Sequence, residues 1–249
     1  DGRFMYFNRT NDKKIKIGNE KVANIKIYRA EFIDSKWDNI IALPFCDDNY
    51  SAEHPVLSKD GKKLYFSSDM PGTLGSFDIF VVAVNEDGTY GTPVNLGNAI
   101  NTTQREQFPE ISNDGTILYF ASDGHQGMGG LDIFMSKSYD GVFAKPLNLG
   151  ATINGGADDF AYVVDEKKNK GYFSSNRKSS DNLYSFNRTE NEERYVIEGE
   201  VKDKNTQTFL PGTQVSLYDE NEILIGQMVV GSDAQYIFNT EPNKKYRLE

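Results

Sequence analysis

Residues 111 to 134 combine residue types that often bind ligands. They read ISNDGTILYFASDGHQGMGGLDIF, in which an Asp-Gly pair and an apolar run precede a glycine-rich loop and Asp132. A glycine-rich loop that holds phosphate needs a helix N-terminus after the glycines and usually a lysine. Here the glycines lead into Leu131 to Phe134, which are mostly strand formers. We therefore predict that these glycines shape a loop between two strands and bind no phosphate.

The aspartates near this loop could instead bind a metal ion. Asp78 and Asp132 occupy matching positions in similar segments, and Asn182 takes the same place further along. Calcium needs six to eight oxygen ligands, and the sequence has no calcium-loop spacing of acidic residues. Because an Asn keeps the acceptor oxygen but loses the charge, we expect these side chains to cap backbone N–H groups of the loop. We predict no metal site and no cofactor.

The remaining titratable residues also offer few catalytic possibilities. Cys46 is the single cysteine, which excludes an intrachain disulfide and a cysteine zinc cluster. His54 and His125 are the two histidines. The Asp-Gly pairs at 60–61 and 114–115 are typical of tight turns.

The opening stretch is one copy of an internal repeat. PVLSKDGKKLYFSSDMPGTLGSFDIF at 55–80 matches PEISNDGTILYFASDGHQGMGGLDIF at 109–134, and the tails at 87–101 and 140–154 match as well. Weaker copies precede and follow them, with Tyr-Phe pairs at 6–7, 65–66, 119–120 and 172–173. A repeat of about 50 residues with four short strands is typical of a propeller blade. We assign the repeats to about 1–50, 51–103, 104–156 and 157–190, and we expect the aromatic pairs to fill the space between blades.

These motifs resemble a known family. The pattern P-x-h-S-x-D-G-x-x-L-Y-F-x-S-D, then G-x-x-D-I-F and P-h-N-L-G-x-x-I-N, is similar to the WD40-like propeller repeat of the TolB type. More narrowly, it resembles the version found in outer-membrane-associated proteins of Bacteroidetes. Residues 195–249 resemble the carboxypeptidase-regulatory-like domain, a small transthyretin-like β-sandwich, without its last strands. The expected linker between the two domains is Asn187 to Arg194.

The predicted fold class is therefore all-β, with a propeller followed by a β-sandwich and with both ends truncated. Four blades are visible, and the resemblance implies five or six in the intact protein. Asp1-Gly2 matches the first hairpin of a blade. We expect residues before Asp1 to supply the innermost strand of that blade, or further blades.

Composition limits the partners. The 249 residues carry a formal net charge of -10, which disfavours nucleic acid and anionic membrane surfaces. No segment approaches the ~20 apolar residues of a membrane span.

An enzyme is the main alternative class. The Asp-box of propeller sialidases has the form S-x-D-x-G-x-T-W, whereas Ser112-Asn113-Asp114-Gly115 places Gly directly after Asp and no Trp follows. The sequence also has no G-x-S-x-G elbow. We predict that the chain is not an enzyme. The alternative is a carbohydrate-active or glycan-binding propeller, which a pair of facing carboxylates with an aromatic platform would favour.

The loops between the second and third strand of each blade vary most between copies, which is typical of a binding face on a rigid scaffold. The candidate partner-binding residues on these loops and beside them are Met70, Arg105, His125, Gln126 and Met128. The resemblance implies a periplasmic, outer-membrane-associated scaffold that binds cell-envelope proteins, in some relatives within the type IX secretion and gliding apparatus. Such proteins bind peptidoglycan through an OmpA-like domain, which these residues do not include.

Overall fold

The computed structural model describes residues 2–17, 19–139, 141–188, 195–241 and 244–249. Their regular elements are strands, so the predicted all-β class is confirmed. The chain divides into two compact units, Asp1–Arg188 and Thr189–Glu249. Asp1 and most of the expected linker, at residues 189–194, lie outside the described residues.

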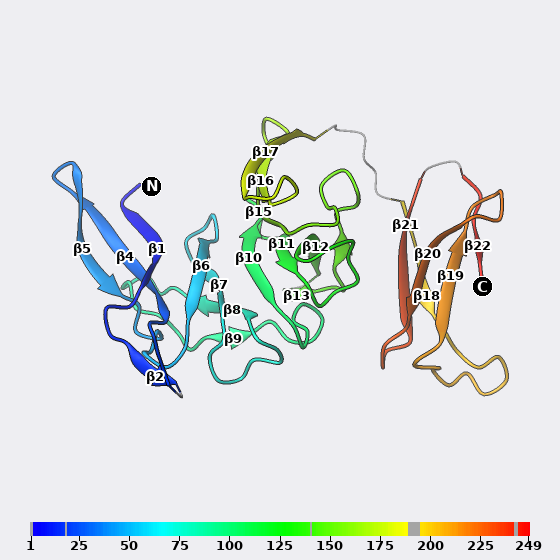
Figure 1. The fold of residues 1–249 in the computed structure, drawn as a ribbon, viewed down its shortest axis with the longest axis horizontal. Coiled ribbons are helices and arrows are strands. Elements are labelled where there is room, and N and C mark those ends of the chain that lie inside the picture. The colour runs from blue at the N-terminus through cyan, green and yellow to red at the C-terminus, as the bar shows by residue number, and fades with distance from the viewer. Residues whose placement is uncertain (1, 18, 140, 189–194, 242–243) are drawn as a thin grey trace. The chain divides into compact units, whose positions relative to one another are not determined.

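The first unit contains the repeats, and its strands follow one another as a series of small sheets (Figure 1). In chain order they are β1 (Phe4–Thr10), β2 (Ile15–Ile17), β3 (Glu20–Val22), β4 (Ile25–Ile33), β5 (Lys36–Ala42), β6 (Ala52–Leu57), β7 (Lys63–Ser68), β8 (Asp78–Ala83), β9 (Val94–Asn95), β10 (Glu106–Ile111), β11 (Ile117–Ser122), β12 (Asp132–Tyr139), β13 (Val142–Phe143), β14 (Leu147–Asn148), β15 (Asp159–Asp165), β16 (Lys170–Ser175) and β17 (Asn182–Asn187).

Each repeat forms one main antiparallel sheet, and the first repeat also contains the separate two-stranded sheet β2-β3. The sheet orders are β1-β4-β5, then β6-β7-β8-β9, then β10-β11-β12-β13 with β14 also on β12, and finally β15-β16-β17. We call these sheets the first to fourth blades. Successive antiparallel sheets of this kind are the blades of a β-propeller, which confirms that part of the fold prediction. The total number of blades stays a prediction.

The aromatic pairs pack between blades, as predicted. Neighbouring residues of a strand point to opposite faces of its sheet. Phe66 accordingly packs with Ile27 and Leu43 of the preceding blade region, while Tyr65 packs with Leu118 of the following blade. The third blade repeats the pattern, since its Tyr-Phe pair is divided between the second–third and third–fourth interfaces. The second and third blades thus each contribute one aromatic side chain of the pair to the core on either side.

The Asp-Gly pairs form the predicted turns. Gly61 and Gly115 both have φ of +73°, a left-handed conformation that glycine adopts without strain. Asp60 and Asp114 each accept a hydrogen bond of 2.6 Å from the serine two residues earlier. These turns join the first and second strands of the second and third blades.

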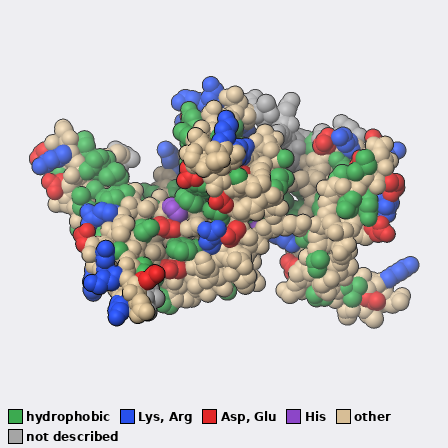
Figure 2. Space-filling model, in the orientation of Figure 1, with side chains coloured by type: hydrophobic (Ala, Val, Ile, Leu, Met, Phe, Trp, Pro, Cys, Tyr) green, Lys and Arg blue, Asp and Glu red, His purple; other side chains and the backbone are tan. Residues whose placement is uncertain are grey.

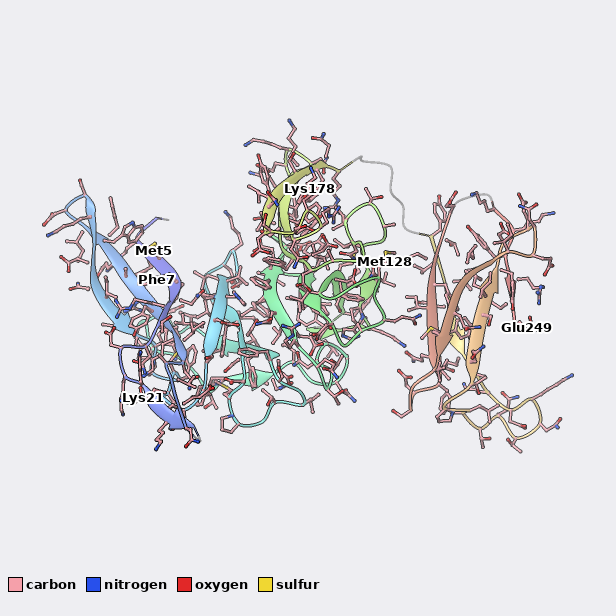
Figure 3. The ribbon with its side chains drawn as sticks, in the orientation of Figure 1. Met5, Phe7, Lys21, Met128, Lys178 and Glu249 are labelled. Carbon is pink, nitrogen blue, oxygen red and sulfur yellow. The ribbon has the colours of Figure 1, made fainter. Side chains whose placement is uncertain are left out.

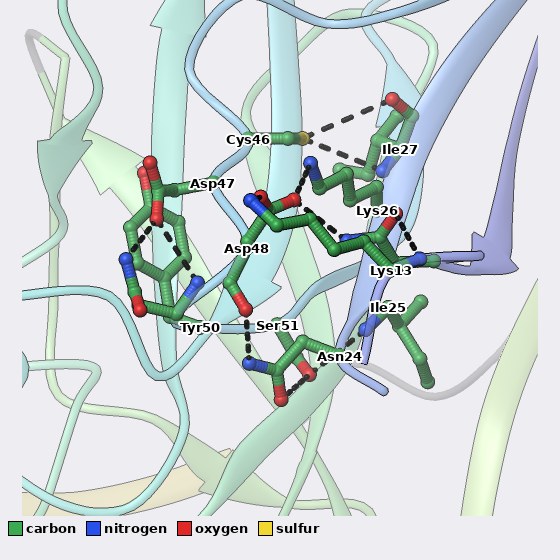
Figure 4. A network of polar contacts seen from close by, with 12 residues as sticks. Lys13, Asn24, Ile25, Lys26, Ile27, Cys46, Asp47, Asp48, Tyr50 and Ser51 are labelled. Atoms are coloured by element: carbon green, nitrogen blue, oxygen red, sulfur yellow. Dashed lines mark hydrogen bonds and ion pairs between the residues drawn. The ribbon is translucent and has the colours of Figure 1, made fainter. Parts of the chain in front are cut away.

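Asp48 connects the first blade to the segment that leads into β6 (Figure 4). Its carboxylate accepts hydrogen bonds from Asn11 at 2.7 Å and Lys26 at 2.6 Å, and it also pairs with Lys13. These hydrogen bonds, that of Lys13 first, hold the pKa of Asp48 well below its usual value. A single carboxylate therefore ties together three segments around the first blade.

The second unit is a small two-sheet structure. It contains β18 (Tyr195–Glu200), β19 (Gln214–Tyr218), β20 (Leu224–Val229), β21 (Gln235–Thr240) and β22 (Arg247–Leu248). Sheets β18-β21 and β20-β19-β22 surround a core of their own, formed by Val215, Leu217, Val230, Ala234 and Phe238. The resemblance of this unit to the carboxypeptidase-regulatory-like domain stays a prediction.

Candidate functional site

The loops between the second and third strands are held in place by buried aspartates. The Asp78 carboxylate accepts the backbone N–H of Leu74 at 2.7 Å, and the Asp132 carboxylate accepts that of Met128 at 2.6 Å. Both aspartates are fully buried at the start of their strands. The capping role predicted for Asp78 and Asp132 is therefore confirmed, and it fixes the backbone of each loop. It is wrong for Asn182, whose amide instead donates to the Ser180 carbonyl at 2.6 Å.

The fixed loops present apolar side chains to solvent. Leu74 is 50% exposed and Met128 is 49% exposed. The two residues lie 54 positions apart, at matching points of two neighbouring blades. Met128 lies at the surface on the β11–β12 loop (Figure 3). Sequence reasoning singled out Met128 and missed Leu74, although the 54-residue repeat offset leads directly from one to the other.

The segment between β9 and β10 lies between these two loops. The Ser76 N–H donates to the Gln104 carbonyl at 2.9 Å, and a Cβ at Gly75 would collide with the same oxygen. A Cβ at Gly124 would likewise collide with the side chain of Thr102. Glycine fits at both points because it has no Cβ, which at Gly75 would meet the backbone of the neighbouring segment and at Gly124 the Thr102 side chain. We call the surface formed by residues 69–77, 96–105 and 123–131 the loop face.

A charged pair lies within the loop face. The Arg105 guanidinium binds the Asp123 carboxylate through Nη2 at 2.7 Å and Nε at 2.8 Å. Asp123 also accepts the Arg105 backbone N–H at 2.8 Å. The Arg105 side chain remains 44% exposed. The pairing with Asp123 thereby orients an exposed guanidinium within the loop face.

The N-L-G-x-x-I-N tails hold the third strands of the second and third blades through their last asparagine. The buried Asn101 amide accepts the Ile79 N–H at 2.8 Å and donates to the Ile79 carbonyl at 3.0 Å. Asn154 makes the same two bonds with Ile133, both at 2.8 Å. An asparagine pairs here with a strand edge as another strand would, so these residues of the motif are structural.

The structure places two of the five predicted partner-binding residues inside the fold. Met70 is 7% exposed and packs in the core between the first two blades. His125 is half-buried, with Nε2 2.7 Å from the Ile100 carbonyl and its ring 5.2 Å from that of Phe134. Burial is the main cause that lowers the pKa of His125.

The other three predicted residues, Arg105, Gln126 and Met128, are exposed on the loop face. Whether any of the five binds a partner stays a prediction. In the fourth blade, Arg177 plays the part of His125, because its guanidinium binds the Ile153 carbonyl. It also pairs with the fully buried Asp159 and lies 5.1 Å from the Phe173 ring. Sequence reasoning missed this anchoring role.

A second feature is an open hollow of about 430 Å³ beside the innermost strands. Each of β6, β10 and β15 contributes one residue with a left-handed backbone, namely His54, Phe108 and Ala161 with φ of 55°, 53° and 52°. At these points the strand register shifts, so all three strands carry the same bulge. The described residues that line it are Tyr6, Phe7, Asn8, His54, Pro55, Val56, Phe108, Pro109, Glu110, Ala161, Tyr162 and Val163.

The lining of the hollow contains several aromatic rings and one carboxylate, that of Glu110. The His54 ring stacks on Phe108 with centroids 3.8 Å apart, and burial lowers the pKa of His54 to about 4. Burial, and next the charge of Glu166, raises the pKa of Glu110 to about 7. Glycosidases use two carboxylates, and Glu110 is the single acidic residue among the described residues of this lining. The lining therefore does not contain the facing pair that would favour a carbohydrate-active propeller.

No metal cluster or membrane span is found in the described parts of the chain. They contain no group of three or more His, Cys, Asp or Glu side chains able to hold a metal ion. They also contain no helix long and apolar enough to cross a membrane.

Comparison with known proteins links the chain to several solved structures. No family profile and no curated protein sequence matches it. A puromycin-hydrolyzing peptidase from Mycobacterium tuberculosis is 16% identical, with a TM-score of 0.42 over 74% of this chain and 29% of that one. TolB from Acinetobacter baumannii is 15% identical, with a TM-score of 0.39 over 70% and 38%. An α-L-arabinofuranosidase from Lactobacillus brevis is 13% identical, with a TM-score of 0.46 over 70% and 62%.

Two of these three structures are enzymes, which corrects one prediction. The prediction that the chain is not an enzyme was wrong, because the solved structures similar to this chain include a peptidase and an arabinofuranosidase. At 13–16% identity the likeness concerns the fold alone and assigns no reaction to this chain. A fold can support many functions, so the site residues must decide. The chain also spans less than two thirds of each of these three structures.

Proposed function

We propose that this chain is a protein-interaction module of the bacterial cell envelope and that the loop face of its second and third blades contacts the partner. The observation that carries the proposal is the exposed pair Leu74 and Met128, each about half exposed on a loop fixed by a buried aspartate. Exposed apolar side chains on a rigid surface bind a partner with little loss of conformational entropy.

The neighbouring charge supports the same surface. Arginine is one of the residue types that contribute most of the binding energy in protein interfaces. In this chain the Asp123 carboxylate already orients the Arg105 guanidinium. The net charge of -10 disfavours nucleic acid as the partner. A protein surface with apolar pockets therefore fits the loop face better than a polyanion does.

The cellular setting of the proposal rests on the family resemblance of the repeats. In this proposal the chain is a periplasmic scaffold in an outer-membrane-associated, peptidoglycan-tethered complex. The type IX secretion and gliding apparatus is the proposed complex. Contact with peptidoglycan would require an OmpA-like domain outside these residues. The partner would then be another protein of that envelope assembly.

The test is a crosslinking pull-down from Bacteroidetes cell envelopes with the wild-type chain and a Leu74→Ser, Met128→Ser variant. We expect the variant to recover an envelope protein at least roughly tenfold less efficiently, as for the loss of central interface residues. Val142→Ser is the matched control, because Val142 is 71% exposed on β13, away from the loop face. Equal recovery by all three proteins would contradict the proposal. Recovery of glycan without an envelope protein would favour the glycan-binding alternative instead.

A further inference from the structure

A second, smaller hollow lies between the Asp-Gly turns of the second and third blades. Residues 58–60 and 113–115 of the two turns line it together with Lys63 and Tyr65, and its volume is about 200 Å³. Strands β7 and β11 begin at these turns and end at the loop face, so the hollow lies at the opposite end of both strands. We call it the turn hollow. Its volume is below the range of drug-sized sites and suits a small solute.

Tyr65 is the buried polar side chain of the turn hollow. It is 4% exposed, and its ring packs in the core between the second and third blades, 6.4 Å from that of Phe143. The described residues give its hydroxyl no hydrogen-bond partner. Burial, and next the charge of Asp60, raises the pKa of Tyr65, so the hydroxyl keeps its proton. Because a buried polar group without a partner costs free energy, this fixed donor is suited to a ligand.

Two lysines add positive charge on the second-blade side of the turn hollow. Lys59 and Lys63 are exposed, and they form no ion pair within the described parts of the chain. The matching positions of the third blade hold Asn113 and Ile117, so the blade itself does not require lysine there. Charged side chains of both signs are interspersed over the visible face of the first unit (Figure 2). The combination with a buried hydroxyl therefore marks this site, rather than the charges alone.

Asp114 supplies a carboxylate on the third-blade side. Its Oδ1 accepts hydrogen bonds from the Ser112 hydroxyl at 2.6 Å and from the Thr116 N–H at 2.9 Å. These bonds, that of Ser112 first, hold the pKa of Asp114 below its usual value, so the group is ionised. Its other oxygen accepts no hydrogen bond from the described residues. Asp60 is held in the same way by Ser58, at 2.6 Å.

The balance of charge determines which solute fits. Two ammonium groups and two carboxylates line the turn hollow, so a simple anion or a simple cation meets charges of its own sign there. A molecule that carries both charges meets a partner for each. The Tyr65 ring is buried in the core, so it offers no platform on which a sugar could stack.

We propose that the turn hollow binds a small zwitterion, a free α-amino acid. Its carboxylate contacts the Tyr65 hydroxyl and the two lysines, and its ammonium group contacts Asp114. Because the lysines are exposed, their ion pairs are weakened by water, and we expect a Kd of roughly 1 mM. The site lies at the opposite end of the blades from the loop face, so this inference is independent of the partner proposed there.

The test is an NMR titration of the whole chain with each of the standard free α-amino acids. We expect at least one of them to shift the backbone amides of residues 58–65 and 113–117 in a saturable way. Tyr65→Phe keeps the core ring and should weaken this binding at least roughly tenfold, as for a lost hydrogen bond to a charged group. The double variant Lys59→Asn, Lys63→Ile, which installs the third-blade residues, should weaken it at least as much.

Lys62→Thr is the matched control. Lys62 is exposed on the same turn but does not line the turn hollow, and the third blade has Thr116 at this position. This variant should bind as the wild type does. The absence of any saturable shift, or equal binding by the wild type and Tyr65→Phe, would overturn the proposal. Shifts of the same amides by inorganic phosphate or glucose as strong as those of the tightest amino acid would also overturn it, because both charges would then not be needed.

Discussion

At the scale of single residues, two asparagine side chains bind the backbone of a blade strand as a neighbouring strand would. Asn101 and Asn154 each satisfy both backbone groups of one residue in a buried strand. An amide can do this because it carries a donor and an acceptor, whereas an ionised aspartate has acceptors alone. Asn101 also donates to Asn95 at 2.8 Å, which links its bonds with Ile79 to the start of the N-L-G-x-x-I-N tail.

Removal of either asparagine side chain should lower the stability of the first unit. We expect Asn101→Ala to lower the free energy of unfolding by about 2–3 kcal/mol, because buried N–H and C=O groups of Ile79 lose their partners. Asn154→Ala should have a similar effect through Ile133. Urea denaturation provides the measurement, with Asn113→Ala at an exposed turn as the control. If Asn101→Ala lowers the free energy of unfolding no more than the control does, the bonds between Asn101 and Ile79 do not stabilise the blade.

At the scale of elements, the inner strands β6, β10 and β15 share one geometry but differ at one decisive position. The register shifts end at Val56 in β6, Glu110 in β10 and Val163 in β15. A carboxylate thus occupies a place that is apolar in both sister strands. Val56 packs against the core between the second and third blades, so the equivalent environment of Glu110 is poorly suited to a charge.

This difference predicts a pH-dependent stability. Burial raises the pKa of Glu110 to about 7 in the folded chain, compared with about 4.3 in an unfolded one. The folded state binds this proton more tightly, so its contribution to stability is full below about pH 4 and is lost as the pH rises through 7. We expect the gain in stability from Glu110→Val to be about 2 kcal/mol larger at pH 8 than at pH 4, after allowance for partial exposure.

Denaturation of both proteins across this pH range measures the effect. Glu86→Gln serves as the control, because Glu86 is exposed outside the core. A Glu110→Val variant with the same pH profile as the wild type would contradict the assignment.

At the scale of the whole molecule, each of the two units contains its own hydrophobic core. Three core clusters lie between the blades of the first unit, and one lies within the second unit. Trp37, the single tryptophan of the chain, belongs to the first blade. Its fluorescence therefore reports unfolding of the first unit.

Separate cores predict separate unfolding. Leu217 is 1% exposed in the core of the second unit, so Leu217→Ala should destabilise that unit by about 2–5 kcal/mol. We expect its circular-dichroism transition to move to lower urea, while the midpoint of Trp37 fluorescence stays unchanged. Leu118→Ala in the first unit should have the opposite pattern. A common shift of both signals in either variant would show that the units unfold together.

The sequence by itself determined the repeating architecture of the first unit. The 54-residue repeat predicted blades, the Asp-Gly pairs predicted their turns, and the Tyr-Phe pairs predicted the packing between them. These features depend on local strand pairing and on alternation along each strand, which a sequence records directly. The caps formed by Asp78 and Asp132 also followed, because the interaction spans four residues.

Only the tertiary structure decided which of the unrepeated residues are available to a partner. Met70 and His125 fill the interior, whereas Arg105, Gln126 and Met128 remain on the surface with Leu74. The environment of Glu110, whose pKa is raised by burial and by the charge of Glu166 of the next blade, was likewise unpredictable. The physical reason is that exposure and desolvation depend on contacts between segments about 50 residues apart, which no local pattern encodes.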